Sequence, residues 1–113
     1  MFSTEKYEII FTGVKDKNFN IEVVVNNWRE AAEIVYEETG LYINAQYTER
    51  VIVCNHCCAL ERAIVATVIR NPISESNAGF FYEVMQQVVN ITKKLSGNVP
   101  TTTVKNNVEV SIR

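Results

Sequence analysis

The first two apolar segments of the chain alternate hydrophobic and polar positions with a period of two. In residues 6–11, one side of the alternation is apolar and aromatic: Tyr7, Ile9 and Phe11. In residues 19–25, the same spacing groups Phe19, Ile21, Val23 and Val25. This period is typical of β-strands, because successive strand side chains point to opposite faces. The turn-like stretch 13–18 lies between them, so we predict a first β-hairpin.

Residues 27–40 change to the helical period. One face of the predicted helix collects Trp28, Ala31, Ala32, Val35 and Tyr36. Asn27 followed three residues later by Glu30 has the pattern of a capping box, which satisfies free N–H groups at a helix start. Gly40 suits the position just past a helix end. We therefore predict a helix from about residue 27 to Gly40.

Two further segments carry strand signals. Between residues 41 and 53 the period of two returns, with Leu41, Ile43, Ala45, Tyr47, Val51 and Val53 in phase. Residues 60–70 are rich in β-branched side chains, which favours a strand. A helix over 60–70 stays open as the alternative, because Leu60, Ile64 and Val68 recur every four residues. Pro72 ends this element.

The clearest helical pattern covers residues 76–97, and a strand pattern over 101–113 follows it. The inward stripe of the helix is Phe81, Val84, Met85, Val88, Thr92 and Leu95. Lys93 and Lys94 occupy the last turn, where they suit the negative end of the helix dipole, and Gly97 is the expected stop. The final strand has Val104, Val108, Val110 and Ile112 in phase.

Together these elements predict the order β-β-α-β-β-α-β. This is an α+β domain, with two helices packed on a mostly antiparallel sheet. The chain has 113 residues, of which 47% are hydrophobic, which is enough for a core of its own. We therefore expect a single domain over residues 1–113.

The net charge of the chain limits the kinds of molecule that it is expected to bind. The net charge is −2 and the isoelectric point about 5.4. This balance argues against non-specific nucleic-acid binding, which needs many Lys and Arg side chains to neutralise phosphates, although a local basic pocket is compatible with it. A run of about 18 apolar residues, as a membrane span needs, is missing. The charges in residues 1–10 argue against a signal peptide, so we expect a cytoplasmic protein with reduced thiols.

All three cysteines and the single histidine fall within residues 54–58, as Cys54, His56, Cys57 and Cys58. One chain lacks the second ligand pair of a closed zinc site, so zinc would need a pair from each of two chains. A Cys–His nucleophile would need a base within reach and usually a third group that orients it. We favour a third interpretation, in which the cysteines are small apolar residues beside a hairpin turn. We therefore predict no metal site.

Arginines supply the candidate anion-binding groups. If the hairpin turn centres on His56, Arg50 lies directly opposite Arg62. Like charges facing each other destabilise a sheet unless an anion or a carboxylate compensates them. A guanidinium donates two hydrogen bonds at once and therefore suits a phosphate. The alternative is a solvated face with compensating carboxylates, and a shift of one residue in register abolishes the pairing.

A second group of candidates lies where the strand over 60–70 ends. Arg70 and Asn71 lead through a polar loop to the N-terminus of the second helix, whose free N–H groups attract anions. Phe80 lies off the inward stripe of that helix, and an exposed aromatic side chain can stack on a base. The alternative is that Arg70 and Asn71 only end a strand, and that Phe80 packs on the first helix or at a subunit contact.

Three stretches resemble the small phage proteins that counter Thoeris immunity by sequestering its cyclic ADP-ribose signal. They are NNWREAAEIVYEETGLYINAQY, VIRNP before the amphipathic helix, and the closing VEVSIR, which together cover roughly residues 26–113. The run CNHCC has no place in that family's pattern. The resemblance implies an oligomeric sponge that holds a cyclic nucleotide with arginines and an aromatic platform and does not cleave it. The matching residues are Arg70, Asn71, Phe80 or Phe81, and Arg113.

We therefore expect a non-enzymatic, phage-type anti-defence protein in the cytoplasm of a bacterial host. It would form homo-oligomers and sequester a small anionic nucleotide, a cyclic ADP-ribose isomer or a related cyclic oligonucleotide, without a cofactor. The candidate ligand-binding residues are Arg50, Arg62, Arg70, Asn71, Phe80, Phe81 and Arg113. The alternative is a small protein-binding inhibitor of the anti-CRISPR or toxin-immunity type, which acts through a protein surface. An inter-subunit zinc protein is a third class.

Overall fold

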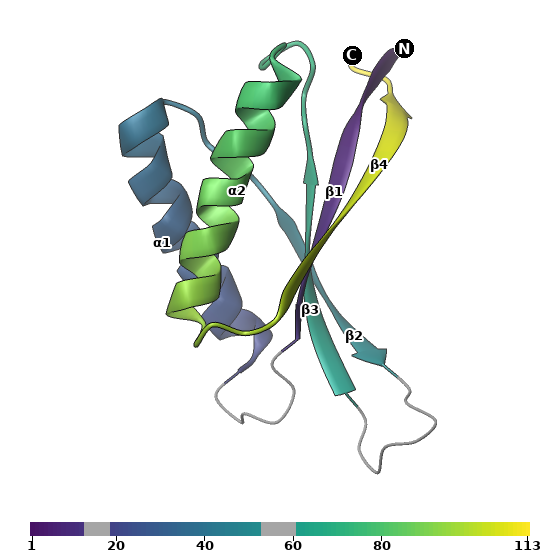
Figure 1. The fold of residues 1–113 in the computed structure, drawn as a ribbon. Helices are drawn as coiled ribbons and strands as arrows, with labels where there is room; N and C mark the ends of the chain where they lie inside the picture. The colour runs from purple at the N-terminus through teal and green to yellow at the C-terminus, as the bar shows by residue number, and fades with distance from the viewer. Residues whose placement is uncertain (13–18, 53–60) are drawn as a thin grey trace.

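The computed structural model describes residues 1–12, 19–52 and 61–113 (Figure 1). Its four strands form one antiparallel sheet in the spatial order β2-β3-β1-β4. Both helices cover the same face of that sheet (Figure 1). The elements follow the order of a ferredoxin-like fold: β1 (Phe2–Thr12), α1 (Ile21–Thr39), β2 (Gln46–Ile52), β3 (Glu61–Ile69), α2 (Ala78–Leu95) and β4 (Thr101–Val110). The predicted α+β class, with two helices on an antiparallel sheet, is confirmed.

The strand predicted over residues 19–25 is wrong, because α1 begins at Ile21. Asn20 is the N-cap, and its side chain accepts a hydrogen bond of 3.0 Å from the backbone N–H of Val23. Val24 is fully buried and continues the stripe of Trp28 by one turn toward the N-terminus. Core packing therefore outweighs the small preference of β-branched residues for strands. The capping box predicted at Asn27 and Glu30 is wrong for the same reason, since both lie inside the helix.

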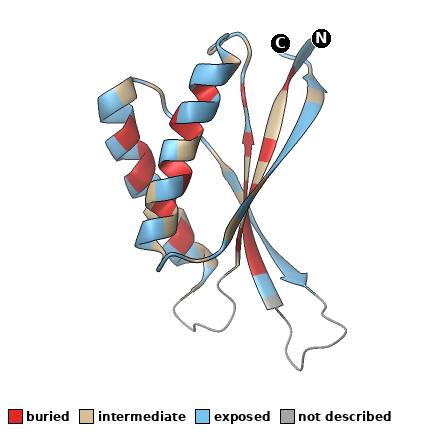
Figure 2. Cartoon of the chain, viewed as in Figure 1, coloured by how far each residue is buried: buried red, intermediate tan, exposed pale blue. Residues whose placement is uncertain are grey.

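The core lies between the helices and the sheet, and its buried positions form stripes on the facing surfaces (Figure 2). β1 is a central strand that pairs with β3 on one side and β4 on the other. The helices cover one of its faces, so Tyr7, Ile9 and Phe11 are almost completely buried. The core residues are Tyr7, Ile9, Phe11, Val24, Trp28, Ala31, Ala32, Val35, Ile43, Ile64, Ala66, Val68, Phe81, Val84, Met85, Val88 and Val89.

The open choice over residues 60–70 resolves as a strand, since β3 covers Glu61–Ile69. The strand expected from residue 41 begins only at Gln46. In the segment before it, Ile43 is buried, and its carbonyl oxygen accepts a 3.1 Å hydrogen bond from the indole Nε1 of Trp28. That bond ties the segment to α1 rather than to the sheet.

The second predicted helix is confirmed as α2, which covers Ala78–Leu95. Asn77 caps its start through a 3.0 Å bond from the Phe80 N–H to Asn77 Oδ1. Gly97 follows its end with a φ of 87°, in the left-handed region that glycine adopts without strain. Leu95, expected on the inward stripe, is instead 44% exposed.

The expected pairing of Arg50 with Arg62 is also wrong, because the register of β2 and β3 differs by one residue. Arg50 lies opposite Ala63, and Arg62 lies opposite Val51. A shift of one residue moves a side chain to the other face of the sheet, so the two guanidinium groups point to opposite faces. Each has a carboxylate instead: Arg50 lies 2.8 Å from Glu8, and Arg62 lies 3.6 Å from Glu49.

Several predictions fall on parts of the chain outside the described residues. These are the turn over 13–18 and the cluster of Cys54, His56, Cys57 and Cys58. Among the described residues, no group of three or more His, Cys, Asp or Glu side chains could hold a metal ion. Neither α1 nor α2 combines the length and the apolar character of a membrane-crossing helix.

Candidate functional site

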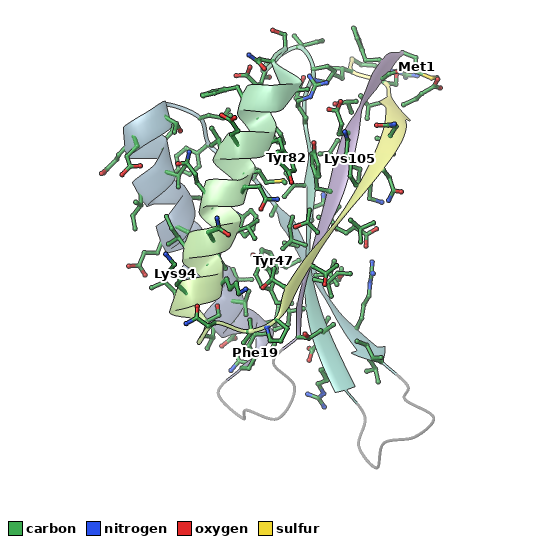
Figure 3. The ribbon with its side chains drawn as sticks, viewed as in Figure 1. Met1, Phe19, Tyr47, Tyr82, Lys94 and Lys105 are labelled. Carbon is green, nitrogen blue, oxygen red and sulfur yellow. The ribbon has the colours of Figure 1, made fainter. Side chains whose placement is uncertain are left out.

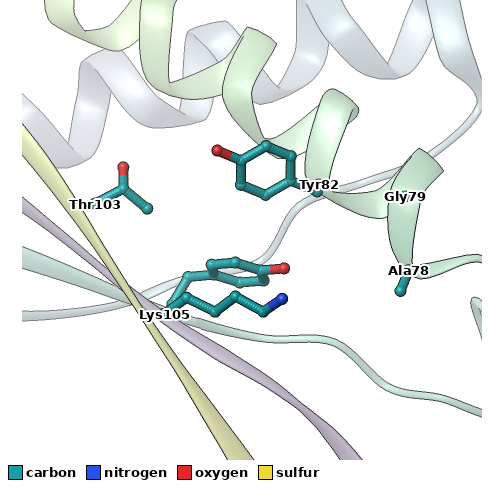
Figure 4. Close-up of a pocket in the computed structure, with 6 residues that line it drawn as sticks. Ala78, Gly79, Tyr82, Thr103 and Lys105 are labelled. Carbon is teal, nitrogen blue, oxygen red and sulfur yellow. The ribbon is translucent and has the colours of Figure 1, made fainter.

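A groove of about 400 Å³ lies between the first turns of α2 and the strands β1 and β4. Its volume is in the range of small-molecule sites. Figure 3 shows Tyr82 of α2 near Lys105 of β4, and Figure 4 shows the groove between them. The residues that line this groove come from three separate parts of the chain: Tyr7, Ala78, Gly79, Tyr82, Thr103 and Lys105.

Aromatic rings form one wall of the groove. The rings of Tyr7 and Tyr82 have centroids 5.7 Å apart and are tilted by 42°. Tyr7 is only 2% exposed and also stacks on Phe81, so its ring is fixed by the core. Tyr82 is 43% exposed, so much of its ring is open to a ligand. Burial, and to a smaller extent the charge of Glu5, raises the pKa of Tyr7 and keeps its hydroxyl protonated.

The first turn of α2 forms a second wall with almost no side chain. Ala78 and Gly79 line the groove directly, so a ligand can approach the helix backbone there. The Asn77 side chain is occupied by its bond from the Phe80 N–H. The N–H groups at the start of a helix carry partial positive charge, which favours a negative group of a ligand.

β4 contributes the polar wall. In the β1–β4 register, Lys105 lies opposite Tyr7 and Thr103 lies opposite Ile9, so both side chains share the helix-covered face of the sheet. Figure 4 shows Thr103 and Lys105 across the groove from Tyr82. The ammonium group of Lys105 therefore adds a positive charge beside the aromatic wall.

An ion pair that is largely shielded from solvent has its carboxylate on β1, close to the groove residue Tyr7. Glu5 precedes Tyr7 by two residues on β1 and so points to the same face. Its Oε2 accepts a 2.6 Å hydrogen bond from Arg70 Nε, and the two side chains are only 17% and 8% exposed. The hydrogen bond from Arg70 lowers the pKa of Glu5 against the opposing effect of burial, and the charge of Lys105 lowers it further. Glu5 is therefore ionised at neutral pH.

Other described hollows suit a nucleoside-sized ligand less well. A hollow of about 370 Å³ at the start of α1 is lined by four residues of that helix alone: Ile21, Glu22, Val25 and Asn26. Two hollows near Asn44 and Ala45 hold about 210 Å³ each. The groove combines a larger volume with aromatic rings and a cation, the usual lining of a small-molecule site.

Arg70 and Asn71, predicted to bind a ligand, are both engaged within the protein. Besides its bond to Glu5, Arg70 donates a 2.9 Å hydrogen bond from Nη1 to the carbonyl oxygen of Glu75. The side-chain oxygen of Asn71 accepts bonds from the N–H groups of Ile73 and Ser74, which shapes the loop before α2. Arg70 is thus tied to β1 through Glu5, and direct contact of either Arg70 or Asn71 with a ligand stays a prediction.

The remaining predicted residues do not gather at one place. Phe81 is 5% exposed and packs in the core, whereas Phe80, on the same helix, is 37% exposed. Arg113 follows the end of β4 and is exposed. Arg62 precedes Arg70 by eight positions, on the order of 25 Å along a strand.

The sequence interpretation missed the residues that line the groove. Tyr7 and Tyr82 were visible as aromatic residues on a strand and on the outer side of a helix, but nothing local placed them together. Lys105 and Thr103 reach the groove only because β4 pairs with β1, which are the last and first strands of the chain. Such long-range pairing leaves no signal in a local pattern.

The sequence profile of a known family, the SAM lyases, matches residues 2–112. The chain belongs to the SAM lyase family. Two solved structures of phage SAM lyase have this fold, and each is 14% identical to the chain in sequence. The unliganded enzyme has a TM-score of 0.55 and aligns over 98% of this chain and 93% of its own. The complex with S-methyl-5′-thioadenosine has a TM-score of 0.53 and aligns over 91% and 90%.

A designed protein, Foldit4, shares the same fold at 8% identity, with a TM-score of 0.52 and coverage of 96% of this chain and 100% of its own. No curated protein sequence matches the chain. At these low identities the solved structures support the fold, and the family assignment comes from the profile.

Membership in the SAM lyase family corrects the sequence interpretation. The expectation of a protein without enzymatic activity is wrong, because the family consists of enzymes that degrade S-adenosylmethionine (SAM). The expected cyclic-nucleotide sponge is likewise not supported, because the chain belongs to a family of enzymes. The association with phage and with a nucleoside ligand recurs in the solved relatives, one of which holds a methylthioadenosine. A homo-oligomer in the cytoplasm of a bacterial host stays a prediction.

Proposed function

We propose that this SAM lyase binds S-adenosylmethionine in the groove between α2, β1 and β4 and releases S-methyl-5′-thioadenosine. The family match over residues 2–112 carries the proposal. The groove supports it because it offers aromatic rings and the ammonium group of Lys105, and because the Glu5 carboxylate lies two residues before Tyr7 on β1. SAM has an aromatic base at one end and a zwitterionic amino acid at the other, so it needs both kinds of surface.

The product identifies the bond that breaks. S-methyl-5′-thioadenosine keeps the methyl group, the sulfur and the adenosine of SAM, so the bond from sulfur to the γ-carbon of the amino acid is cleaved. The electron pair of that bond goes to sulfur, which changes from a sulfonium cation to a neutral thioether. The substrate's own carboxylate oxygen can form the new bond to the γ-carbon and close a five-membered lactone. This route needs no water and transfers no proton, and holding SAM folded would supply much of the acceleration.

The charge change explains why a sheltered groove suits this reaction. A carboxylate and a sulfonium, with opposite charges, become neutral groups as the ring closes. Water stabilises the separated charges of the ground state more than the neutralising transition state. A groove whose wall is the buried ring of Tyr7 displaces some of that water. The protonated Tyr7 hydroxyl is not required as a base.

The groove residues match the two ends of SAM. The exposed ring of Tyr82 can stack on adenine, as aromatic side chains do in many nucleotide sites. Lys105 can hold the substrate carboxylate without covering both of its oxygens. Glu5 Oε1, the oxygen that does not receive the Arg70 Nε bond, can accept from the substrate ammonium group.

Depletion of SAM also supports the predicted anti-defence role. SAM is the methyl donor of methyltransferases and a cofactor of some restriction systems, so its removal would weaken a defence that depends on it. The alternative of a protein-binding inhibitor predicts a surface patch and no turnover of any nucleoside. One assay therefore separates the two classes.

The test is turnover of SAM by the purified protein, followed by mass spectrometry. We expect S-methyl-5′-thioadenosine and a four-carbon lactone, and in ¹⁸O-labelled water the initial lactone should carry no label. Tyr82→Ala should lower kcat/KM by about tenfold, a typical effect of losing a stacked base. Tyr36→Ala is a matched control, because both tyrosines are 43% exposed and lie on helices. Intact SAM after prolonged incubation would contradict the proposed function.

A further inference from the structure

Hydrogen bonds hold Arg70 beside Glu5, which lies two residues before the groove residue Tyr7 on β1. Its backbone N–H donates 3.1 Å to the carbonyl oxygen of Glu5, and its own carbonyl accepts a 2.7 Å bond from the Thr4 hydroxyl. Its guanidinium donates to Glu5 Oε2 and to the carbonyl oxygen of Glu75. These four hydrogen bonds join the end of β3 to β1 and to the loop before α2.

Stability alone does not account for this arrangement. Taking two charges out of water costs free energy that their attraction often fails to recover, so an apolar pair of similar size can be equally stable. Arg50 and Glu8 form an ion pair in the same protein that costs less desolvation free energy. Their distance is 2.8 Å, and the arginine side chain is 51% exposed. A buried pair beside a ligand groove is better explained by the geometry it imposes.

We propose that Arg70 is a positioning residue of the lyase site, which presents the Glu5 carboxylate, ionised and in one orientation, to the cationic end of the substrate. The inference rests on the proposed function. The guanidinium fork is fixed on one side by the Glu75 carbonyl, so its Nε bond fixes one carboxylate oxygen of Glu5 and leaves the other for the ligand. A lysine could keep the charge but would lose this fixed two-point geometry.

The neighbours of Glu5 indicate what removal of Arg70 would do. Arg70 at the end of β3 and Lys105 on β4 lower the pKa of Glu5, with the Arg70 hydrogen bond as the largest cause, whereas burial raises it. Asn107, which lies directly opposite Glu5 on β4, is uncharged. Tyr7 carries a hydroxyl whose raised pKa keeps it neutral. Without Arg70, burial would be opposed only by a hydrogen bond from the Glu5 backbone N–H and by the charge of Lys105, so the pKa of Glu5 would rise.

The test compares Arg70→Lys, Arg70→Met and the double variant Glu5→Gln/Arg70→Met, with Arg62→Lys as control. Arg62 is an exposed arginine that lies 3.6 Å from the Glu49 carboxylate. We measure kcat and KM for SAM from pH 5 to 9, and the affinity for S-methyl-5′-thioadenosine, which lacks the cationic amino acid. We expect Arg70→Lys to lower kcat/KM for SAM by about tenfold. We expect its affinity for the thioadenosine to stay within about threefold, because the Glu5 contact is absent from that ligand.

The pH profile separates positioning from a general loss of structure. In Arg70→Met, activity should fall as pH drops through the raised pKa of Glu5, at a pH where the wild type is still active. The double variant should have low activity at every pH and should not show this fall at low pH, because it lacks the Glu5 carboxylate. If Arg70→Met does not fold, ¹³C NMR of the Glu5 carboxyl in Arg70→Lys gives the same comparison without turnover. An unchanged pH profile and an unchanged Glu5 pKa, or equal losses for both ligands, would overturn the role of Arg70. An inactive wild type with an altered Glu5 pKa in the variant would instead reject the proposed function.

Discussion

Two charged side chains to which the proposed site assigns a role, Glu5 and Lys105, have different surroundings. Glu5 is largely buried and has a fixed arginine partner. Lys105 is exposed, so its ammonium group is free to follow a ligand. This difference predicts that Glu5 requires precise placement and that Lys105 acts mainly through its charge.

We expect Lys105→Met to raise KM for SAM by about tenfold, because a hydrogen bond between charged groups contributes roughly 1.5–3 kcal/mol and solvent weakens it here. kcat should change less than KM, since the contact is made in the bound substrate as well. Steady-state kinetics test this, with Lys94→Met as control because Lys94 is an exposed lysine at the opposite end of α2. A KM equal to that of the wild type would remove Lys105 from the site.

Tyr47 offers a prediction about stability. Its hydroxyl is buried without a hydrogen-bond partner among the described residues, and burial raises its pKa well above the ordinary value. The ring itself packs edge-on against Trp28, with centroids 5.9 Å apart. Tyr47→Phe keeps the ring and removes the unpaired polar atom, so the free energy of unfolding should stay equal or rise by up to about 1 kcal/mol.

Thermal unfolding monitored by circular dichroism checks this, with a rise in Tm of up to about 4 °C as the upper limit. Tyr42→Phe is the control, because the Tyr42 hydroxyl donates to Glu33 and its loss should not raise Tm. A clear fall in Tm for Tyr47→Phe alone would mean that this hydroxyl does have a partner.

At the residue scale, only part of the site could be predicted from the sequence. The sequence indicated Arg70 as a ligand-binding candidate but gave no sign of its bond to Glu5. The reason is that Glu5 lies 65 positions away along the chain, and only the β1–β3 pairing brings it to Arg70. The polar groups that satisfy a buried arginine cannot be derived from a local pattern.

At the element scale, α1 shows how two periodic patterns can overlap. Residues 19–25 satisfy a period of two, but Val24, Trp28, Ala31 and Val35 satisfy the helical period over a longer stretch. The longer pattern wins, because a helix is stabilised by its whole buried face rather than by a few residues. α2 and β4 were predicted from the sequence, and Asn77 and Gly97 mark the two ends of α2. β3 could not be separated from a helix, because Leu60, Ile64 and Val68 also recur every four residues.

The start of α1 can be tested by two substitutions. Asn20→Ala removes the side chain that accepts from the Val23 N–H and should lower the free energy of unfolding by about 1 kcal/mol. Glu30→Ala, at an exposed position inside the helix, should change it by less than about 0.5 kcal/mol. Urea unfolding curves give both values. A larger effect at Glu30 than at Asn20 would place the helix start near residue 27.

At the scale of the whole molecule, the fold assembles the groove from the two ends of the chain. β1 and β4 are neighbours in the sheet, and α2 crosses the same face beside them (Figure 1). The class of fold could be read from the order of elements, but this meeting of first and last strands could not. The expected function was corrected from a sponge to the SAM lyase family by a match that spans nearly the whole chain, and no short motif indicated it.

The central claim is that a SAM-derived nucleoside binds in this groove, and amide NMR tests it most directly. We would titrate S-methyl-5′-thioadenosine into the ¹⁵N-labelled protein and follow the backbone signals. The account predicts that the largest shifts cluster at Ala78, Gly79, Tyr82, Thr103 and Lys105, and that Tyr82→Ala weakens them while Tyr36→Ala does not. Shifts clustered instead around Trp28, Tyr42 and Tyr47, or no shifts at millimolar ligand, would contradict it.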